Sequence, residues 1–257
     1  MIKYLGSKRN LLEQILTVVG AFESVNSVAD VFSGTARVGH ALKSAGYQVF
    51  SNDHNAYAAT LACCYVQADL ETWQADAQRL VDEFNKLPGE PGYFTKTFCE
   101  DARYFQPKNG ARVDAIRERI ASLHLHPELE AIMLVSLMEA ADRVDSTTGI
   151  QMAYLKKWAS RSNNDLELRV PNLLSSSAKG KSLATQKEAI DFVKATEADL
   201  VYLDPPYNQH SYLGNYHIWE SLVLWDKPEV YGIANKRLDV RDATTKSRFN
   251  GRKDMPL

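Results

Sequence analysis

Cysteine is scarce in this chain, which has three cysteines among its 257 residues: Cys63, Cys64 and Cys99. Two of them are adjacent, and there is no second close pair to complete a four-ligand zinc site of the common kind. Free cysteine otherwise behaves as a small apolar residue. We therefore expect three reduced thiols, in the core or at the surface, and no bound metal.

Long apolar runs are also missing. No segment approaches the ~18 consecutive apolar residues that a membrane-spanning helix needs. Residues 1–9 contain no apolar stretch like that of a secretory signal. We therefore expect a cytoplasmic protein without a membrane partner.

The chain has almost no net charge: its formal charge is −2, from 30 Lys and Arg against 32 Asp and Glu. This argues against a protein that coats nucleic acid through bulk positive charge. It does not exclude a local basic groove, because a few Lys and Arg on one face are enough to contact phosphates.

The chain begins with the pattern of a βαβ unit. Residues 27–32 are a mostly apolar run typical of a buried strand, and residues 47–50 predict the next strand, which ends at Asn52 and Asp53. A glycine-containing turn and a short helix connect the two, and Gly46 is placed to end that helix. Such a unit implies parallel strands joined by a right-handed crossover.

The alternation of strands and helices is lost between residues 57 and 180. Helical patterns replace it, at residues 74–84, 111–123 and 127–144. Pro127 stands at the first position of the last helix, where its missing N–H donor is not needed. Residues 175–181, rich in serine and lysine, predict a flexible link.

The βαβ pattern resumes after this link. Residues 187–195 predict a short helix, and residues 199–203 form a near-continuous apolar run of the parallel-strand type. After Trp225 the chain is polar and charged, without a convincing strand. We therefore expect an α/β fold with a parallel sheet, in which residues 1–56 and 181–225 form the two parts of the catalytic domain, residues 57–180 a largely helical insertion and residues 226–257 a basic-rich tail.

The turn after the first strand has the sequence FSGTARVG, residues 32–39. A glycine turn between a strand and a helix lets backbone N–H groups approach a bound nucleotide closely. Asp53, at the end of the next strand, stands about where an acid binds ribose hydroxyls in nucleotide-binding folds. The pair fits a nicotinamide cofactor as well as S-adenosylmethionine, and it is also compatible with a purely structural turn.

A tetrapeptide decides between the two cofactors. The apolar run 199–203 leads into Asp204, Pro205, Pro206 and Tyr207, at the carboxyl end of a strand, where open α/β sheets bind ligands. The Asp204 carboxylate and the Pro205 carbonyl offer two acceptors for the N–H groups of an exocyclic amine, which turns the amine's lone pair toward a methyl donor. Consecutive prolines hold the backbone rigid, and Tyr207 offers an aromatic face to an extruded base.

With these motifs, the chain resembles adenine-specific DNA methyltransferases of the restriction–modification type. The matched segments are residues 3–8 (KYLGSK), 32–39, 52–53 and 204–207. They follow the family's order of cofactor clamp, glycine turn, target-recognition insertion and catalytic tetrapeptide, which implies that residues 57–180 are the target-recognition region. The resemblance implies a Rossmann-like methyltransferase fold, S-adenosyl-L-methionine as cofactor and double-stranded DNA as partner. It also implies methyl transfer to N6 of an adenine that is flipped out of the duplex.

The resemblance further implies roles for individual residues. Tyr4 and Lys8 are expected to close over the methionine end of the cofactor, with Lys8 pairing its carboxylate. Glu188, next to Ala189, stands where the family carries an acid that accepts a hydrogen bond from the cofactor's adenine, although many relatives have Asp there. Ala36 stands where many relatives have glycine. The cofactor contacts expected in all are Tyr4, Lys8, Phe32, Gly34, Thr35, Asp53, Glu188 and Ala189, and the catalytic residues are Asp204, Pro205, Pro206 and Tyr207.

Two basic-rich segments are candidates for contact with DNA. The first combines basic, amide and aromatic side chains: Tyr154, Lys156, Lys157, Trp158, Arg161, Ser162, Asn163, Asn164 and Arg169. These suit phosphate contacts and base-edge reading, but an ordinary solvated face has the same composition. The second, in the tail, either follows DNA or is disordered: Lys236, Arg237, Arg241, Lys246, Arg248, Arg252 and Lys253. His210, after the tetrapeptide, is expected to be a hydrogen-bonded loop residue.

Three alternative functions stay open. An RNA base N6 methyltransferase would use the same tetrapeptide, although the large insertion favours DNA. A nicotinamide-dependent dehydrogenase would have no use for the tetrapeptide. A truncated methyltransferase would bind DNA as a remnant without activity.

The short segment after the tetrapeptide makes the truncated form a serious alternative. About fifty residues follow Tyr207, and none after Trp225 has the pattern of a buried parallel strand. The resembled family has a seven-stranded sheet whose fourth strand carries the tetrapeptide. We therefore expect an exposed sheet edge, self-association, weak cofactor binding and poor or no methylation by the isolated chain. A missing C-terminal segment or a second polypeptide would restore it.

Overall fold

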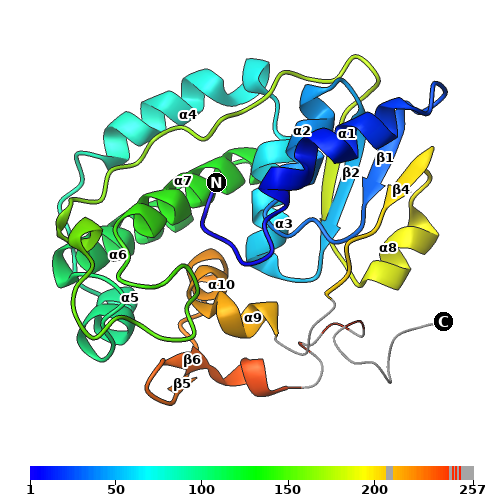
Figure 1. Cartoon of the computed structure of the whole chain (residues 1–257). Coiled ribbons are helices and arrows are strands. Elements are labelled where there is room, and N and C mark those ends of the chain that lie inside the picture. The colour runs from blue at the N-terminus through cyan, green and yellow to red at the C-terminus, as the bar shows by residue number, and fades with distance from the viewer. Residues whose placement is uncertain (207–210, 243–244, 246, 248, 250–257) are drawn as a thin grey trace.

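The fold is organised around a four-stranded parallel sheet with the strand order β3-β2-β1-β4 (Figure 1). The strands are β1 (Ser27–Asp30), β2 (Gln48–Asp53), β3 (Leu183–Gln186) and β4 (Leu200–Tyr202). The computed structural model describes residues 1–206, 211–242, 245, 247 and 249. The expected α/β fold with a parallel sheet is confirmed.

Helices cover both faces of the sheet. Val28 and Val49, which are paired between β1 and β2, are buried in the main hydrophobic core. Ala29 and Val31 face the other way and pack with Phe192. Successive side chains of a strand alternate between faces, so a sheet covered on both sides has two cores. The covering helices are α1 (Leu12–Gly20), α2 (Arg37–Ser44) and α3 (Ala56–Ala62) on the first face and α8 (Ala189–Ala195) on the second.

The chain between β2 and β3 is mostly helical, as expected. After α3 come α4 (Leu70–Phe84), α5 (Tyr93–Thr95), α6 (Pro107–Ser122) and α7 (Pro127–Arg143). Helix α7 contacts α3, α4 and α6, and its Leu129, Ile132, Val135 and Leu137 are buried as predicted. Helix α6 begins at Pro107 rather than at residue 111, because proline suits the first helical turn.

Strand β3 has no counterpart among the predicted strands. Its residues are exposed or half-buried and mostly not strongly apolar, so an edge strand of this kind leaves no apolar run. The flexibility expected of the link before it stays a prediction, although the last residue of the link makes several contacts. Lys181 forms ion pairs with Asp69 at 2.8 Å and Glu128 at 3.1 Å, and Gln48 donates a hydrogen bond to its carbonyl. These contacts fix the chain where it enters β3.

The segment after Trp225 contains no parallel strand among its described residues, as expected. It forms a short antiparallel hairpin whose strands have two residues each. Arg237 is buried and forms ion pairs with Asp226 at 2.7 Å and Asp239 at 2.8 Å, so it is not available to DNA. The elements after β4 are α9 (Tyr212–Asn215), α10 (His217–Leu224), β5 (Val230–Tyr231) and β6 (Lys236–Arg237). Lys246, Arg248, Arg252 and Lys253 lie outside the described residues.

Strand β4 lies at an edge of the sheet. Among the described strands it pairs with β1 alone, and the side chains of Val201 and Leu203 are 48% and 62% exposed. The edge expected for the tetrapeptide strand is therefore open in the described part of the chain. Self-association through it stays a prediction.

The three cysteines are free thiols, as expected, and Cys64 and Cys99 are buried. Burial raises the pKa of the Cys63 thiol to about 12, which leaves it protonated and unreactive at neutral pH. No helix in the described part of the chain is long and apolar enough to cross a membrane.

Helix α3 is held in place by a carboxylate from α10. The buried Glu220 accepts hydrogen bonds from the backbone N–H groups of Ala56, at 3.0 Å, and Tyr57, at 2.9 Å. These donors belong to the first turn of α3, where no helical carbonyl is available to them. Because α3 follows directly on β2, Glu220 fixes the position of the strand end that carries Asp53.

Replacement of this carboxylate should destabilise the fold. Glu220→Ala leaves two buried N–H groups without acceptors, and we expect the free energy of unfolding to fall by ~2–3 kcal/mol in urea titrations. The matched control is Glu83→Ala, which removes a more exposed carboxylate paired with Arg119 at 2.9 Å and should cost under ~1 kcal/mol. Equal losses in the two variants would show that Glu220 does not anchor α3.

Candidate active site

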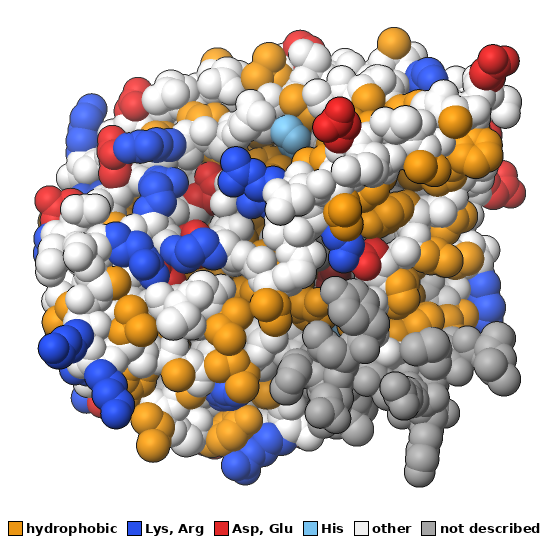
Figure 2. Space-filling view, viewed as in Figure 1, with side chains coloured by type: hydrophobic (Ala, Val, Ile, Leu, Met, Phe, Trp, Pro, Cys, Tyr) orange, Lys and Arg blue, Asp and Glu red, His pale blue; other side chains and the backbone are white. Residues whose placement is uncertain are grey.

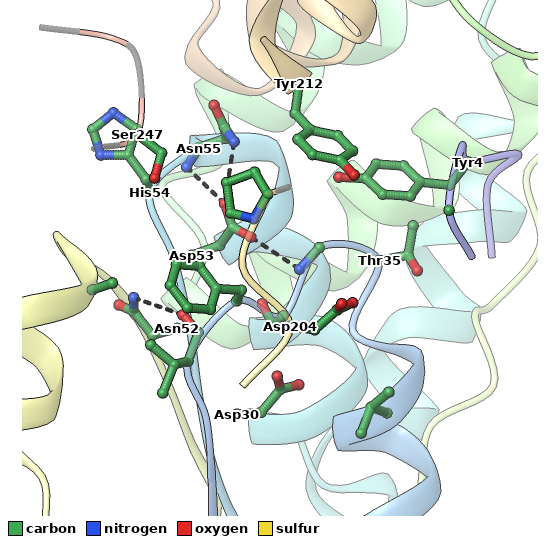
Figure 3. Close-up of a pocket in the computed structure, with 18 of the residues that line it drawn as sticks. Tyr4, Asp30, Thr35, Asn52, Asp53, His54, Asn55, Asp204, Tyr212 and Ser247 are labelled. Carbon is green, nitrogen blue, oxygen red and sulfur yellow. Dashed lines mark hydrogen bonds between the residues drawn. The ribbon is translucent and has the colours of Figure 1, made fainter. Parts of the chain in front are cut away.

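A pocket lies at the carboxyl ends of β1, β2 and β4 (Figure 3), where parallel α/β sheets bind ligands. The predicted site residues that line it are Tyr4, Lys8, Phe32, Gly34, Thr35, Asp53, Glu188, Ala189, Asp204 and Pro206. Pro205 does not line it, and Tyr207 and His210 lie outside the described residues. Asp53 and Asp204 are far apart in the sequence, and the sheet brings them to the same edge, as expected.

The turn after β1 brings backbone groups to the pocket. Gly34 has a φ of +53° and Ala36 a φ of +60°, both in the left-handed region that favours glycine. Ala36, which stands where many relatives have glycine, is fully buried and adopts this conformation, at a cost of about 1–2 kcal/mol. A Cβ on Gly34 would meet the ring of Tyr4 at 3.6 Å.

The Asp53 carboxylate joins this turn to the start of α3 (Figure 3). One oxygen accepts a hydrogen bond from Gly34 N–H at 2.9 Å, and the other accepts from Asn55 N–H at 3.0 Å. Burial raises the pKa of Asp53, while the hydrogen bonds from Asn55 and Gly34 act in the opposite direction. The carboxylate is thus fixed in orientation at the end of β2.

The N-terminal segment closes the pocket next to β4. The Lys8 ammonium lies 2.7 Å from an oxygen of Asp204, and both side chains are mostly buried. Lys8 was expected to pair the carboxylate of a cofactor, and the structure shows it beside the acid of the tetrapeptide. An ammonium has three N–H donors, so one lysine can serve Asp204 and a second acceptor together.

Tyrosine rings form the wall around Tyr4. Its ring is nearly parallel to those of Tyr216, 4.5 Å away between centroids, and Tyr212, 5.5 Å away, and its hydroxyl lies 3.3 Å from that of Tyr57. Tyr212 also lines the pocket (Figure 3). Neither Tyr212 nor Tyr216 was predicted at the site. Both residues follow the tetrapeptide closely in the sequence, and this position was the sign that could have placed them at the site.

The segment after β3 reaches the pocket through Asn52. This buried side chain donates a hydrogen bond to the Lys187 carbonyl at 3.1 Å and accepts one from Lys187 N–H at 3.0 Å. These contacts position Glu188 and Ala189 at the pocket wall. Glu188 lies 3.4 Å from the ring of His54, the residue after Asp53.

Asp30 is the acidic residue of the pocket that sequence reasoning missed. It ends β1 and is 1% exposed, and the backbone N–H of Gly39 is the hydrogen-bond donor that acts to lower its pKa. Burial raises the pKa of Asp30 to about 7, with further contributions from the charges of Asp53 and Asp204. No group of three described His, Cys, Asp or Glu side chains is placed to hold a metal ion.

Neutralising Asp30 should stabilise the protein in a pH-dependent way. Its pKa of about 7 in the folded chain lies above the usual 3.8, so the stability that its protonated form contributes is present below pH 3.8 and is lost as the pH rises through 7. We expect the gain from Asp30→Asn in free energy of unfolding to be about 2–3 kcal/mol larger at pH 8 than at pH 5. Asp191→Asn, at an exposed position of α8, should show no such difference. The same gain at both pH values for Asp30→Asn would contradict the raised pKa.

Comparison with known proteins agrees with this geometry. The family of D12 class N6 adenine-specific DNA methyltransferases matches residues 4–248. Type II methyltransferase M.NlaIII of Neisseria lactamica is 31% identical over 240 residues, which are 88% of this chain and 70% of the relative. No solved structure matches the chain significantly.

Two further relatives are longer proteins. Type II methyltransferase M.FokI of Planomicrobium okeanokoites is 30% identical over 255 residues, 92% of this chain. Modification methylase StsI of Streptococcus sanguinis is 31% identical over 252 residues, 90% of this chain. The chain spans 39% and 38% of their lengths. Since the family match extends from Tyr4 at the pocket wall past the tetrapeptide, the chain belongs to the D12 class of N6 adenine-specific DNA methyltransferases.

Proposed function

We propose that this protein transfers a methyl group from S-adenosyl-L-methionine to N6 of an adenine that is flipped out of double-stranded DNA. The observation that carries the proposal is the meeting of Asp53 and Asp204 in one pocket at the carboxyl edge of the sheet. The first stands where a nucleoside ribose is bound, and the second begins the tetrapeptide that suits an exocyclic amine. The names of the relatives, type II methyltransferases, agree with it.

The charges of the pocket fit this cofactor. S-adenosylmethionine carries a sulfonium and an ammonium cation beside one carboxylate. Asp30, a buried carboxylate of the pocket, is a suitable neighbour for one of these cations. Lys8, which lies beside Asp204, is expected to bind the cofactor's carboxylate as well. The other expected contacts are Tyr4 over the methionine end, Asp53 on the ribose, Glu188 and Ala189 on the adenine, and Phe32, Gly34 and Thr35 along the turn.

The tetrapeptide orients the target amine. The cofactor supplies an electrophilic methyl group. Asp204 accepts one N–H of the adenine amine and the Pro205 carbonyl accepts the other, so that the nitrogen lone pair leaves conjugation with the ring. Pro206 keeps the backbone rigid, and Tyr207 stacks on the base. After methylation the nitrogen is cationic and acidic, so it releases its proton to water without a dedicated base.

The proposed nucleic-acid partner is double-stranded DNA. Tritium transfer from labelled cofactor to duplex DNA and to RNA tests this, and we expect label in DNA alone, at the low rate that is predicted for the isolated chain. Sequencing-based mapping of methylated adenines in cells that express the protein identifies the target sequence. Label in RNA alone would show that the substrate is RNA and not DNA.

Asp204→Ala should abolish most methylation. The carboxylate acts on the transition state through alignment of the amine, and loss of such a group costs ~2.7–4 kcal/mol, or 10²–10³-fold in rate. Single-turnover methyl transfer measures this, while equilibrium binding of the cofactor should remain. The control is Asp191→Ala, on the solvent side of α8. Turnover near the wild-type rate in Asp204→Ala would remove this residue from catalysis.

Asp53→Ala should act on binding instead. Hydrogen bonds to a charged group contribute about 1.5–3 kcal/mol, so we expect the cofactor Kd to rise by about 10- to 100-fold, as measured by isothermal titration calorimetry. The single-turnover rate at saturating cofactor should change little. An unchanged Kd in a variant that is still folded would exclude Asp53 from the ribose subsite.

A further inference from the structure

A buried carboxylate joins the N-terminal segment to a loop that follows α7. The Asp145 side chain is 4% exposed, and one of its oxygens accepts hydrogen bonds from Lys3 Nζ at 3.1 Å and from Arg161 Nε at 2.7 Å. Its other oxygen accepts from the Thr147 hydroxyl. Arg161 also donates to the Thr147 carbonyl at 2.6 Å. Two cations from distant parts of the chain therefore share one buried acid.

On one side, Asp145 and Asp142 together hold a wall of the pocket, because the Lys3 ammonium lies beside both carboxylates. Lys3 directly precedes Tyr4, and its backbone N–H donates to an oxygen of Asp142 at 3.1 Å. The same segment continues to Lys8, which lies beside Asp204. A shift of Lys3 would therefore shift the residues that are proposed to cover the methionine end of the cofactor.

On the other side, Asp145 holds a basic loop, defined here as residues 146–164. Within it, Thr147 pairs with Tyr154 in an antiparallel bridge, and Ala159 N–H donates to the Ser146 hydroxyl at 3.0 Å. The loop contains Lys156, Lys157 and Arg161 and not one Asp or Glu. Hydrogen bonds thus give the loop a defined shape, and its charge is entirely positive.

The outer part of the basic loop is open to solvent. Lys156 and Lys157 are exposed, and the Arg103 guanidinium lies 4.8 Å from the ring centre of Trp158. In the view of Figure 2, most of the visible Lys and Arg side chains lie on the left half of the molecule, the side that holds α4, α5 and α6 in Figure 1. Exposed cations beside an aromatic ring suit a phosphate backbone.

The basic loop also contacts the helices next to the pocket. Gln151 N–H donates to the Asn215 carbonyl at 2.8 Å, and its side-chain oxygen accepts from Ile218 N–H at 2.9 Å. Asn215 directly precedes Tyr216, whose ring stacks on Tyr4. The loop therefore meets the site from two directions, through Asp145 and through the start of α10.

We propose that Asp145 is a positioning residue that couples cofactor binding in the pocket to DNA binding at the basic loop. The inference rests on the proposed function for the identity of the two ligands. A cofactor that orders the N-terminal segment also orders Lys3, hence Asp145, Arg161 and the loop. DNA that orders the loop acts along the same contacts in reverse, because coupling between two binding sites is reciprocal.

The test measures binding of sinefungin, an unreactive analogue of S-adenosylmethionine, with and without mixed-sequence duplex DNA. In the wild-type protein we expect DNA to lower the sinefungin Kd, so that the ratio of the Kd without DNA to the Kd with DNA is about five or more. In Asp145→Asn, which keeps the shape of the side chain and removes its charge, this ratio should fall to within about two-fold of one, although both ligands still bind. Lys3→Met and Arg161→Met, at half-exposed cations, should each reduce the ratio as well and decide the matter if Asp145→Asn does not fold.

The matched control is Arg143→Met. Arg143 stands at the end of α7 and donates to the Glu167 carbonyl instead of Asp145, so its replacement removes the same charge as Arg161→Met and should keep the wild-type ratio. A wild-type ratio in Asp145→Asn, or an equal loss in Arg143→Met, overturns the coupling role and leaves the proposed function intact. If the wild-type protein binds both ligands but DNA does not change its sinefungin Kd, the coupling role is also overturned and the proposed function stays intact. Failure of the wild type to bind either ligand overturns the proposed function and this inference with it.

Discussion

The hydrogen bonds accepted by Asp53 hold together the strand ends from which the pocket is built. One oxygen binds the turn after β1 through Gly34, and the other binds the start of α3 through Asn55. Glu220 then caps the next residues of α3 from α10. Parallel strands bring their carboxyl ends to one edge, but these carboxylates determine how the loops leave that edge. The shape of the site therefore depends on buried acids as much as on apolar packing.

This construction concentrates negative charge in a poorly solvated place. Asp30 is buried beside the charges of Asp53 and Asp204, which raises its pKa, while Lys8 lies against Asp204. A cationic ligand relieves the repulsion, and S-adenosylmethionine brings two positive groups. In the proposed mechanism the acids are divided between the two substrates: those on β1 and β2 bind the cofactor, and the acid after β4 orients the amine.

The sequence predicted the parts of the site that follow from strand ends. Asp53 ends the strand that residues 47–50 predict, Asp204 comes directly after an apolar run, and a parallel sheet places such residues together. Asp30 was missed because it lies inside an apolar run, where its charge looks like an interruption of the strand. Strand β3 was missed because an edge strand needs no apolar run. The contacts of Asp145 with Lys3 and Arg161 join residues up to 142 positions apart, and no local periodicity records an ion pair of that range.

The central claim is that Asp204 directs a methyl group to the amino nitrogen of adenine. The most direct measurement is nucleoside analysis of duplex DNA after incubation with the protein and S-adenosylmethionine that carries an isotopically labelled methyl group. We predict label in N6-methyladenine, and a 10²–10³-fold slower appearance of it with Asp204→Ala. Label in a different nucleoside, or none from protein that binds both cofactor and DNA, would contradict the account.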